Sequence, residues 1–327
     1  MESIPMVSIA VITYNHSKYI RNALNSILMQ QVNFEYEIVV GDDCSPDDTQ
    51  DILREYQTLY PDKFKMILRP KNIGPTKNYY DVIMQCTGKY IAHLEGDDYW
   101  TDENKLQKQV DFLNANPQYI GTAHRMTMVG EDGQVLAHQY YPDCKERIYT
   151  LKHYGKGLLP GHFATLVYRN IYKENKYDYS VLYKAHEFIA DRTIALILAA
   201  QGNIYCFDER MSCYRYVTGH GTSFSAKQYG KKDYKGMYRY YYNLADYCKQ
   251  ELYSTNALKN VECNLFLMAI GVGIENRLKP MIIFRTYKSL TDKRYVCFCT
   301  LSRIIDLTFK KVTTLLKHYV KKCFENS

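Results

Sequence analysis

Three carboxylic acids stand together in this chain at Glu95, Asp97 and Asp98, interrupted only by Gly96, directly after the apolar run of residues 90–94. A buried strand would end at this point, so the carboxylates would project from the end of a strand. Hard divalent cations such as Mg²⁺ and Mn²⁺ take carboxylate oxygens as ligands. The spacing therefore predicts a divalent metal site at a strand end.

A second acidic corner, Asp42 and Asp43, follows the apolar run of residues 37–40. In open α/β sheets, ligands bind outside the carboxyl ends of the strands. The simpler interpretation is that each acidic pair is a solvated turn or a helix cap, which is the commoner role for any single Asp-Asp pair. Two such corners in one series of strands favour a binding site.

The elements that would position these acids alternate along the first hundred residues. Apolar patterns predict strands at 7–13, 36–40, 65–68 and 90–94, and helices at 17–31, 45–60 and 76–86. Alternation of this kind is typical of an α/β fold with a doubly wound, mainly parallel sheet. Right-handed crossovers then place all the predicted strand ends on one edge of the sheet.

The length of 327 residues exceeds what one core usually supports, which suggests a further domain or an extension. We expect the α/β domain to occupy residues 1–225 and a helical region to occupy residues 226–327. Within that region, residues 301–324 form a basic amphipathic helix, which either packs on the domain or lies on an anionic membrane.

The composition of the chain indicates its cellular compartment and the charge of its ligand. The chain has 42 Lys and Arg against 35 Asp and Glu, a net charge of +7 that suits an anionic ligand without requiring nucleic acid. Its ten cysteines form no C-x-x-C pair, which fits reduced thiols in the cytoplasm. No secretion signal or apolar run of membrane-spanning length is visible. We expect a cytoplasmic protein with no nucleic-acid partner.

Several nucleotide-dependent enzymes are excluded by missing motifs. The chain has neither G-x-G-x-x-G nor G-x-x-x-x-G-K-[ST]. A nucleotidyltransferase would need a glycine-rich basic loop after the first strand, and an aspartyl-phosphate phosphatase would need a pair of aspartates there. The residues present are instead Thr13, Tyr14 and Asn15, whose polar groups and ring could hold a base or a ribose.

The serial motifs of the first 115 residues resemble those of family 2 glycosyltransferases with the GT-A fold. The similar segments, in order, are residues 7–15, 42–47, 72–74, 88–92 and 95–100, and a later stretch from Phe188 through Gly202 to Arg215 resembles the acceptor half of that family. The resemblance implies a half that binds the nucleotide-sugar at 1–115 and an acceptor half at 116–225.

The resemblance also implies roles for individual residues. Thr13, Tyr14, Asn15, Asp42 and Asn72 would hold the nucleoside of the donor, with Asp42 facing the base. Glu95, Gly96 and Asp97 occupy the family's D-x-D motif. Asp97 would bind Mn²⁺ or Mg²⁺ on the diphosphate, and Glu95 would reach the ribose or a water on the metal. His220 would be a further contact to the metal or the diphosphate.

Asp191 matches the aspartate that the family uses as a general base, although a helix N-cap is its alternative role. A single base opposite the leaving group implies inversion at the anomeric carbon. His162, Trp100 and Glu187 are predicted on the acceptor side, where Glu187 is also a fallback base.

The resemblance thus implies a metal-dependent enzyme that uses a nucleotide-sugar, with uridine as the usual base. Its acceptor would be a glycan or a lipid-linked oligosaccharide, in the synthesis of a bacterial surface polysaccharide such as a capsule or O-antigen. The enzyme would work in the cytoplasm or peripherally on the inner face of the membrane, through residues 301–324. A non-catalytic scaffold with the same fold is the competing hypothesis.

Overall fold

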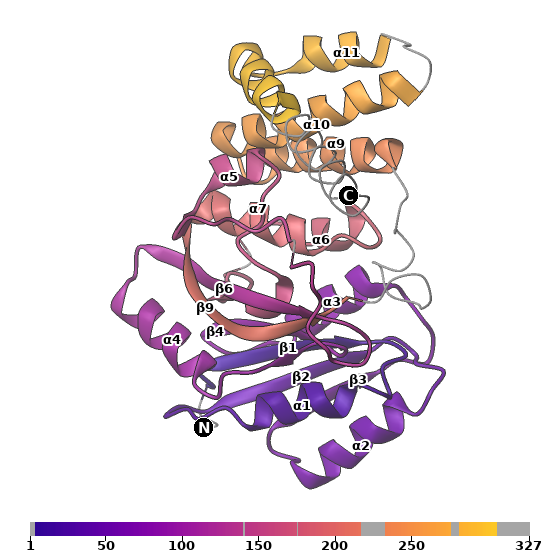
Figure 1. Cartoon of the computed structure of the whole chain (residues 1–327), viewed down its shortest axis with the longest axis vertical. Coiled ribbons are helices and arrows are strands. Elements are labelled where there is room, and N and C mark those ends of the chain that lie inside the picture. The colour runs from indigo at the N-terminus through magenta and orange to yellow at the C-terminus, as the bar shows by residue number, and fades with distance from the viewer. Residues whose placement is uncertain (1–3, 140, 175, 217–232, 276–280, 306–327) are drawn as a thin grey trace, which may run out of the picture.

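The computed structural model describes residues 4–139, 141–174, 176–216, 233–275 and 281–305. A sheet and its flanking helices form one part of the molecule, and a stack of helices lies beyond it (Figure 1). The first part begins with the elements β1 (Val7–Thr13), α1 (Ile20–Leu28), β2 (Tyr36–Asp42), α2 (Thr49–Leu59), β3 (Phe64–Leu68), α3 (Pro75–Ile83) and β4 (Tyr90–Glu95). The predicted alternation of strands and helices is confirmed.

The sheet has the strand order β3-β2-β1-β4-β8-β6-β9-β5 among the described residues, with β7 paired to β9. Strands β1 to β4 are parallel to their neighbours within that set, whereas β8 (Val167–Arg169) is antiparallel to both β4 and β6. The predicted mainly parallel α/β sheet is therefore confirmed. In register, Thr13 lies beside Asp42, and Ile12 lies beside Glu95.

Strand alternation in β1 explains how the sheet is covered on both faces. Val7, Ile9 and Val11 join one buried apolar cluster with α1, whereas Ala10 joins the other cluster with α3. Successive side chains of a strand point to opposite faces, so a strand covered on both sides is apolar at nearly every position. This burial fixes the register and with it the place of each strand end.

The second part of the sheet domain is less regular. It contains β5 (Tyr99–Trp100), α4 (Lys105–Ala115), β6 (Tyr119–Val129), β7 (Ile148–Tyr149), α5 (Leu151–Gly155), η1 (Phe163–Thr165), β8, α6 (Val181–Lys184), α7 (Asp191–Gln201) and β9 (Asn203–Arg215). The long strands β6 and β9 are parallel, with three register shifts between them. β9 also pairs with β5, so it passes close to the acidic corner.

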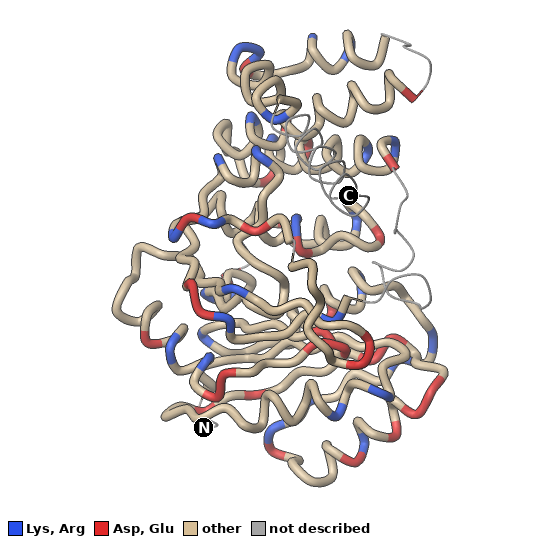
Figure 2. Tube along the Cα trace, viewed as in Figure 1, with Lys and Arg blue, Asp and Glu red and all other residues tan. Residues whose placement is uncertain are grey.

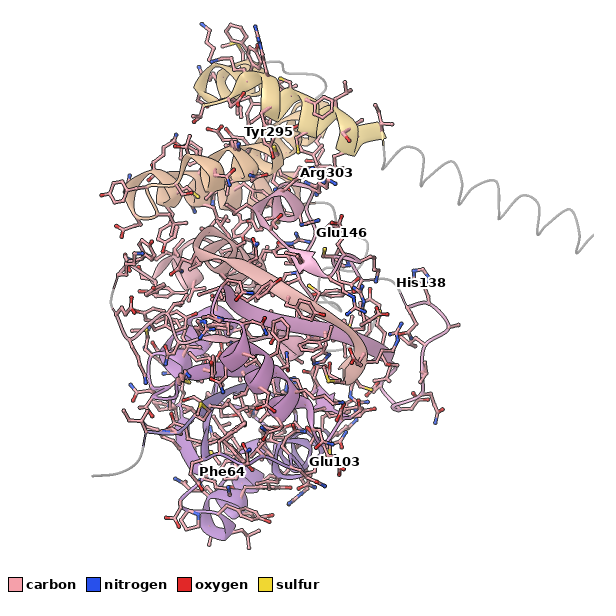
Figure 3. All side chains as sticks on the ribbon, turned by 90° about the vertical axis from the view of Figure 1, so that its left-hand side faces the viewer. Phe64, Glu103, His138, Glu146, Tyr295 and Arg303 are labelled. Carbon is pink, nitrogen blue, oxygen red and sulfur yellow. The ribbon has the colours of Figure 1, made fainter. Side chains whose placement is uncertain are left out.

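Helices α9 (Tyr234–Gln250), α10 (Thr255–Glu275) and α11 (Met281–Ser289) form the stack, and residues 293–305 are also helical. Figure 3 shows Tyr295 and Arg303 in this stack, at the end of the molecule opposite Phe64. The buried core around α7 continues into α9 and α10 through residues such as Leu244 and Val261. The predicted helical character after the sheet domain is confirmed for the described residues.

Helix α10 is the one helix among the described residues that is long and apolar enough to cross a membrane by length and composition. Two thirds of its apolar window, 67%, is buried inside the molecule. A core helix of a soluble protein meets the same criterion, so packing accounts for its composition. The predicted helix at 301–324 lies outside the described residues beyond Ile305.

Candidate active site

Two adjoining cavities open at the strand ends. The crossover cavity, of about 710 Å³, is lined mainly by the turns after β1, β2 and β3, including Thr13, Tyr14, Asp43 and residues 72–78. The central cavity, of about 700 Å³, is lined by later segments that include Tyr141, His162, Asp191, Tyr214 and Met237. Both are lined by Glu95 and Asp97, so the acidic corner lies where they meet.

The structure corrects the predicted role of Asp42. Its side chain is fully buried, and its carboxylate accepts hydrogen bonds from the Ser45 amide at 3.0 Å, from the Ser45 hydroxyl and from Gln50 Nε2 at 2.6 Å. It does not line either cavity. Consecutive strand residues face opposite sides, so only one member of the Asp42-Asp43 pair can reach the cavity.

Asp43 is the member that lines the crossover cavity. Its two carboxylate oxygens accept the backbone amides of Ile73 at 2.8 Å and Gly74 at 2.9 Å, and Asn72 donates to its carbonyl at 2.9 Å. Burial raises the pKa of Asp43, although these amides oppose the shift. The predicted residue Asn72 therefore lies at the cavity and braces its wall.

Two other predicted donor-site residues shape the turn and do not line either cavity. Asn15 has φ 60°, and its amide donates to Ser45 Oγ at 2.9 Å. A Cβ at Gly96 would lie 2.6 Å from Thr13 Oγ1, so glycine lets the acidic corner pack directly on the end of β1. Asn tolerates the left-handed backbone better than most residues. Thr13 and Tyr14, in contrast, line the crossover cavity.

Asp97 lies at the wall shared by the two cavities, beside a histidine that the sequence interpretation passed over. His16 Nε2 is 3.7 Å from Asp97 Oδ2, and His16 Nδ1 is 3.3 Å from Thr13 Oγ1. The imidazole thus joins the end of β1 to the acidic corner. Figure 2 shows acidic positions gathered at this edge of the sheet.

A second cluster lies behind this wall. His162 Nδ1 is 3.4 Å from Asp98 Oδ2, and His162 Nε2 is 3.7 Å from Glu95 Oε2. Asp98 is 1% exposed, and its Oδ2 has no hydrogen-bond partner. His162 was predicted on the acceptor side; it lines the central cavity but also joins two acids of the corner.

The electrostatics of this cluster follow from burial. Desolvation raises the pKa of both Asp98 and Glu95, and Asp97 adds to both shifts, with Asp191 also acting on Glu95. Burial lowers the pKa of His162 to about 3. Acids held at raised pKa beside a neutral imidazole form a site whose negative charge is costly unless a cation shares it.

The side chains present fit a divalent metal ion. Ligand atoms of Glu95, Asp98 and His162 all lie within 4.8 Å of one another. Two carboxylates and an imidazole make a donor set suited to Mn²⁺ or Zn²⁺, and with water ligands to Mg²⁺. The otherwise unpaired Asp98 Oδ2 gives such an ion a buried ligand, with Asp97 adjacent at the cavity wall.

Asp191 is the first residue of α7 and lines the central cavity with Glu95 and Asp97. The N-cap position belongs to Ala190, and no side chain caps the helix. Asp191 Oδ1 accepts the adjacent Arg192 amide at 2.7 Å, and Arg192 donates to the Gly157 carbonyl at 3.1 Å. The side chain of Asp191 is thus at the cavity without serving as the N-cap.

Arg215, at the end of β9, holds the acidic corner in place. Its amide donates to Asp98 Oδ1 at 2.8 Å, and its Nε donates to the Asp97 carbonyl at 3.0 Å. Its guanidinium also donates to the carbonyls of Gly130 and Glu131 and lies 4.4 Å from the centroid of the Tyr19 ring. β9 therefore fixes the backbone that presents Asp97.

The remaining predicted site residues have different outcomes. Trp100 is 1% exposed and its Nε1 donates to the Ala164 carbonyl at 3.0 Å, so the prediction of an acceptor contact is wrong. Trp100 is the last residue of β5, and its ring packs in a buried apolar cluster. Glu187 lines the crossover cavity and not the central one. His220 lies outside the described residues.

Comparisons with known proteins bear on the family and the fold. The model of glycosyl transferase family 2 matches residues 8–175, which is half of the chain. The chain belongs to glycosyl transferase family 2. It is 43% identical over 127 residues to the uncharacterized protein Rv1520 of Mycobacterium tuberculosis strain H37Rv, a match that covers 39% of this chain and 37% of that protein. It thus aligns with little more than a third of that relative's length.

Two further relatives extend the comparison. A Bacillus subtilis strain 168 protein, provisionally named the teichuronic acid biosynthesis glycosyltransferase TuaG, is 32% identical over 109 residues, or 33% of this chain and 42% of its own. The crystal structure of S. aureus TarS 1-349 in complex with UDP-GlcNAc has a TM-score of 0.59 at 19% identity, covering 93% of this chain and 91% of that one. At that identity, the likeness shows the fold alone.

Sequence reasoning assigned no individual role to four residues whose importance depends on distant contacts. Asp43, His16, Asp98 and Arg215 gain their roles from neighbours in other elements. Their only signals in the sequence were the second acid of each Asp pair and a histidine three residues after Thr13. These signals do not say which acid faces a cavity.

Proposed function

We propose that this protein is an inverting, metal-dependent glycosyltransferase that moves a sugar from a nucleotide-sugar to a hydroxyl group. The observation that carries the proposal is the meeting of two cavities at Glu95 and Asp97, with Asp191 across the central cavity. One cavity has the polar turns of a nucleotide site, and the other has a carboxylate placed to receive a proton.

The crossover cavity would hold the nucleoside. Asp43 would accept a hydrogen bond from a base N–H, while Thr13, Tyr14 and Asn72 would contact the ribose and the base. The structure with which this fold agrees was solved with UDP-GlcNAc, and uridine carries an N–H donor that suits Asp43. We therefore propose a UDP-sugar as the donor, with a hexose or N-acetylhexosamine as the transferred group.

The acidic corner would hold the diphosphate through Mn²⁺ or Mg²⁺. Glu95, Asp98 and His162 would hold the ion, with Asp97 beside it at the cavity wall. A bound divalent cation stabilises the negative charge that develops on a departing nucleoside diphosphate. Arg215 keeps Asp97 in place by its hydrogen bond to the Asp97 carbonyl.

Asp191 would act as the general base. It would accept the proton of the acceptor hydroxyl group while the oxygen of that hydroxyl group attacks the anomeric carbon. One displacement opposite the leaving group inverts the configuration, and no second carboxylate nucleophile is needed. The acceptor would be a glycan or lipid-linked saccharide, because TuaG is named for teichuronic acid biosynthesis. We propose a role in surface polysaccharide synthesis at the cytoplasmic side of the membrane.

The test is release of nucleoside diphosphate from a panel of sugar nucleotides with Mn²⁺, Mg²⁺ or EDTA. Wild type should turn over one donor slowly and only with metal, and Asp97→Ala should lose this turnover. Asp208→Ala, which removes an acid that is 76% exposed on β9, is the matched control and should keep it. Failure of every donor to bind in a thermal-shift assay would favour the non-catalytic scaffold hypothesis.

A further inference from the structure

A third cavity lies in the helical stack, away from the acidic corner. It is about 750 Å³ and lies between α9, α10 and α11, with Tyr238, Tyr242, Val272, Met281 and Ile282 providing ring and aliphatic surface. Lys235, Arg239 and Arg285 also line it. We name this cavity, with those eight residues, the helical groove.

The three cations of the helical groove lack acidic partners. Lys235, Arg239 and Arg285 are exposed, and none forms a salt bridge with any carboxylate in the described residues. Lys235 and Arg239 are four residues apart on α9, so they share one helix face. Arg285 is held opposite them because Tyr238 on α9 hydrogen-bonds Thr286 on α11 at 3.1 Å.

Large apolar side chains are exposed in the helical groove and on the adjoining part of α11. Tyr242 is 58% exposed, Met281 57% and the neighbouring Phe284 52%. Exposed side chains of this size that are grouped together mark a binding surface more often than isolated ones do. Long basic side chains beside exposed aliphatic and ring surface are typical of helices that lie in a membrane interface.

The distribution of charge along the chain supports an anionic partner at this end. Residues 226–327 contain 19 Lys and Arg against 8 Asp and Glu, whereas residues 1–225 contain 23 against 27. The overall charge of +7 therefore arises from the C-terminal region alone. Figure 2 shows Lys and Arg positions distributed over the helical stack.

We propose that the helical groove binds the phosphate headgroup of an anionic membrane lipid. Lys235, Arg239 and Arg285 contact the phosphate, and the hydrocarbon chain lies along Met281, Ile282 and Tyr242. A soluble anion would use the cations but would leave the apolar lining exposed to water, so the combination of both surfaces favours a lipid.

The helical groove also has a structural link to the active site. Met237 lines the central cavity, while Lys235 and Tyr238, within one turn of it on α9, line the helical groove. A lipid held on one side of α9 would bring the central cavity close to the membrane surface. This consequence rests on the proposed function, because it matters only if the central cavity receives a lipid-linked acceptor; lipid binding itself does not depend on catalysis.

The test is sedimentation of the full chain with vesicles of phosphatidylcholine, with or without phosphatidylglycerol. Wild type should bind only the anionic vesicles. The triple variant Lys235→Ala, Arg239→Ala, Arg285→Ala should lower the partition coefficient on the order of a hundredfold, the factor expected from about 1 kcal/mol per basic residue. Met281→Asp should also weaken binding, because it places an acid where the lipid chain would lie.

The control is a triple variant with the same change in charge, which removes exposed cations from the sheet domain. Its substitutions are Arg54→Ala, Lys65→Ala and Lys108→Ala. Equal loss in both triple variants would overturn the proposal, as would equal binding of wild type to both vesicle types. A thermal shift with inorganic phosphate but no vesicle binding would also overturn it, in favour of a soluble ligand. Donor turnover is measured for the same helical-groove variants. Turnover reports on the proposed function and vesicle binding reports on the helical groove, so the failure of one can be distinguished from the failure of the other.

Discussion

The two halves of the sheet domain differ in how their polar groups are satisfied. In the first three strand-helix units, buried polar groups have partners in the same unit or the next one, as Asp42 has in Ser45 and Gln50 and Asp43 has in residues 73 and 74. Among the described residues, eight buried side-chain polar atoms have no hydrogen-bond partner, and none precedes β4: one is on His93 of β4, six are on the later residues Asp98, Lys105, Gln109, His124, Tyr154 and Ser212, and one is on Tyr247 of α9.

The polar groups in the wall of the crossover cavity are already hydrogen-bonded, whereas the wall of the central cavity lies beside a polar group without a partner. The crossover cavity is built by consecutive turns whose hydrogen bonds already hold it, so we expect it to bind a nucleotide with little rearrangement. The central cavity gathers Tyr141, His162, Asp191 and Tyr214 from distant segments, beside a carboxylate oxygen of Asp98 with no partner. Unpaired buried polar groups are costly, and at functional sites they are often completed by a ligand or an ion.

The largest expected effect is on Asp191 in the central cavity. Asp191→Asn should lower the rate of sugar transfer by about 10²- to 10⁴-fold, because the amide cannot accept the acceptor proton. Donor binding, measured by thermal shift with the nucleotide-sugar, should remain. Equal loss of donor binding and transfer would contradict the separation of the two cavities. Glu209→Gln, at an exposed position on β9, is the control.

The corresponding test of the crossover cavity is Asp43→Ala. It removes the acceptor of the Ile73 and Gly74 amides and the carboxylate proposed to face the base, so donor affinity should fall about tenfold to a hundredfold, at about 1.5–3 kcal/mol for a hydrogen bond to a charged group. Isothermal titration with the nucleoside diphosphate measures this change. Asp42→Asn keeps the buried volume and should affect stability more than affinity; the reverse ranking would show that Asp42 faces the base.

Lys105 tests the cost of an unpaired group in the second half. It is fully buried with Nζ 4.1 Å from the centroid of the Trp100 ring, and burial lowers its pKa well below the usual value. Between that lowered pKa and about 10.4 the unfolded chain binds the extra proton, so wild-type stability should rise with pH across this window. Lys105→Met should stabilise the protein near neutrality by about 1–3 kcal/mol.

The stabilisation by Lys105→Met should shrink as pH rises toward 10, and denaturant unfolding at several pH values measures it. Lys108→Met, on the exposed face of the same helix, is the matched control. A stabilisation by Lys105→Met that stays constant up to pH 10 would show that the buried amine is not deprotonated in the folded state.

The smallest expected effect is at Glu187, which lines the crossover cavity through a segment joined to α3 by the hydrogen bond from Thr76 to its carbonyl. That bond uses the backbone, so Glu187→Gln leaves it intact. Both the transfer rate and the donor KM should change less than about threefold. A loss of transfer as large as that of Asp191→Asn would instead assign the base to Glu187.

Local rules were enough to predict the α/β fold and the strand ends that carry the site. The apolar runs of β1, β2 and β4 and the stripe of α1 follow the periods of strand and helix, and right-handed crossovers place the ends together. The placement of Thr13, Tyr14, Glu95 and Asp97 at strand ends follows from those elements, whereas Asn72 and Asp191 were predicted from the family resemblance; all six line a cavity.

The tertiary structure decided which face of a strand each acid occupies and which residues from distant segments come into contact. Asp43 and not Asp42 reaches the cavity because a strand turns its side chains to opposite faces, and the sequence did not show where β2 ends. Arg215 meets Asp97 because β9 pairs with β5 after more than a hundred intervening residues, and Asp98 meets His162 because the turn before η1 packs against the acidic corner. Sequence alone determined the kinds of groups at the site, and only long-range packing determined which of them meet.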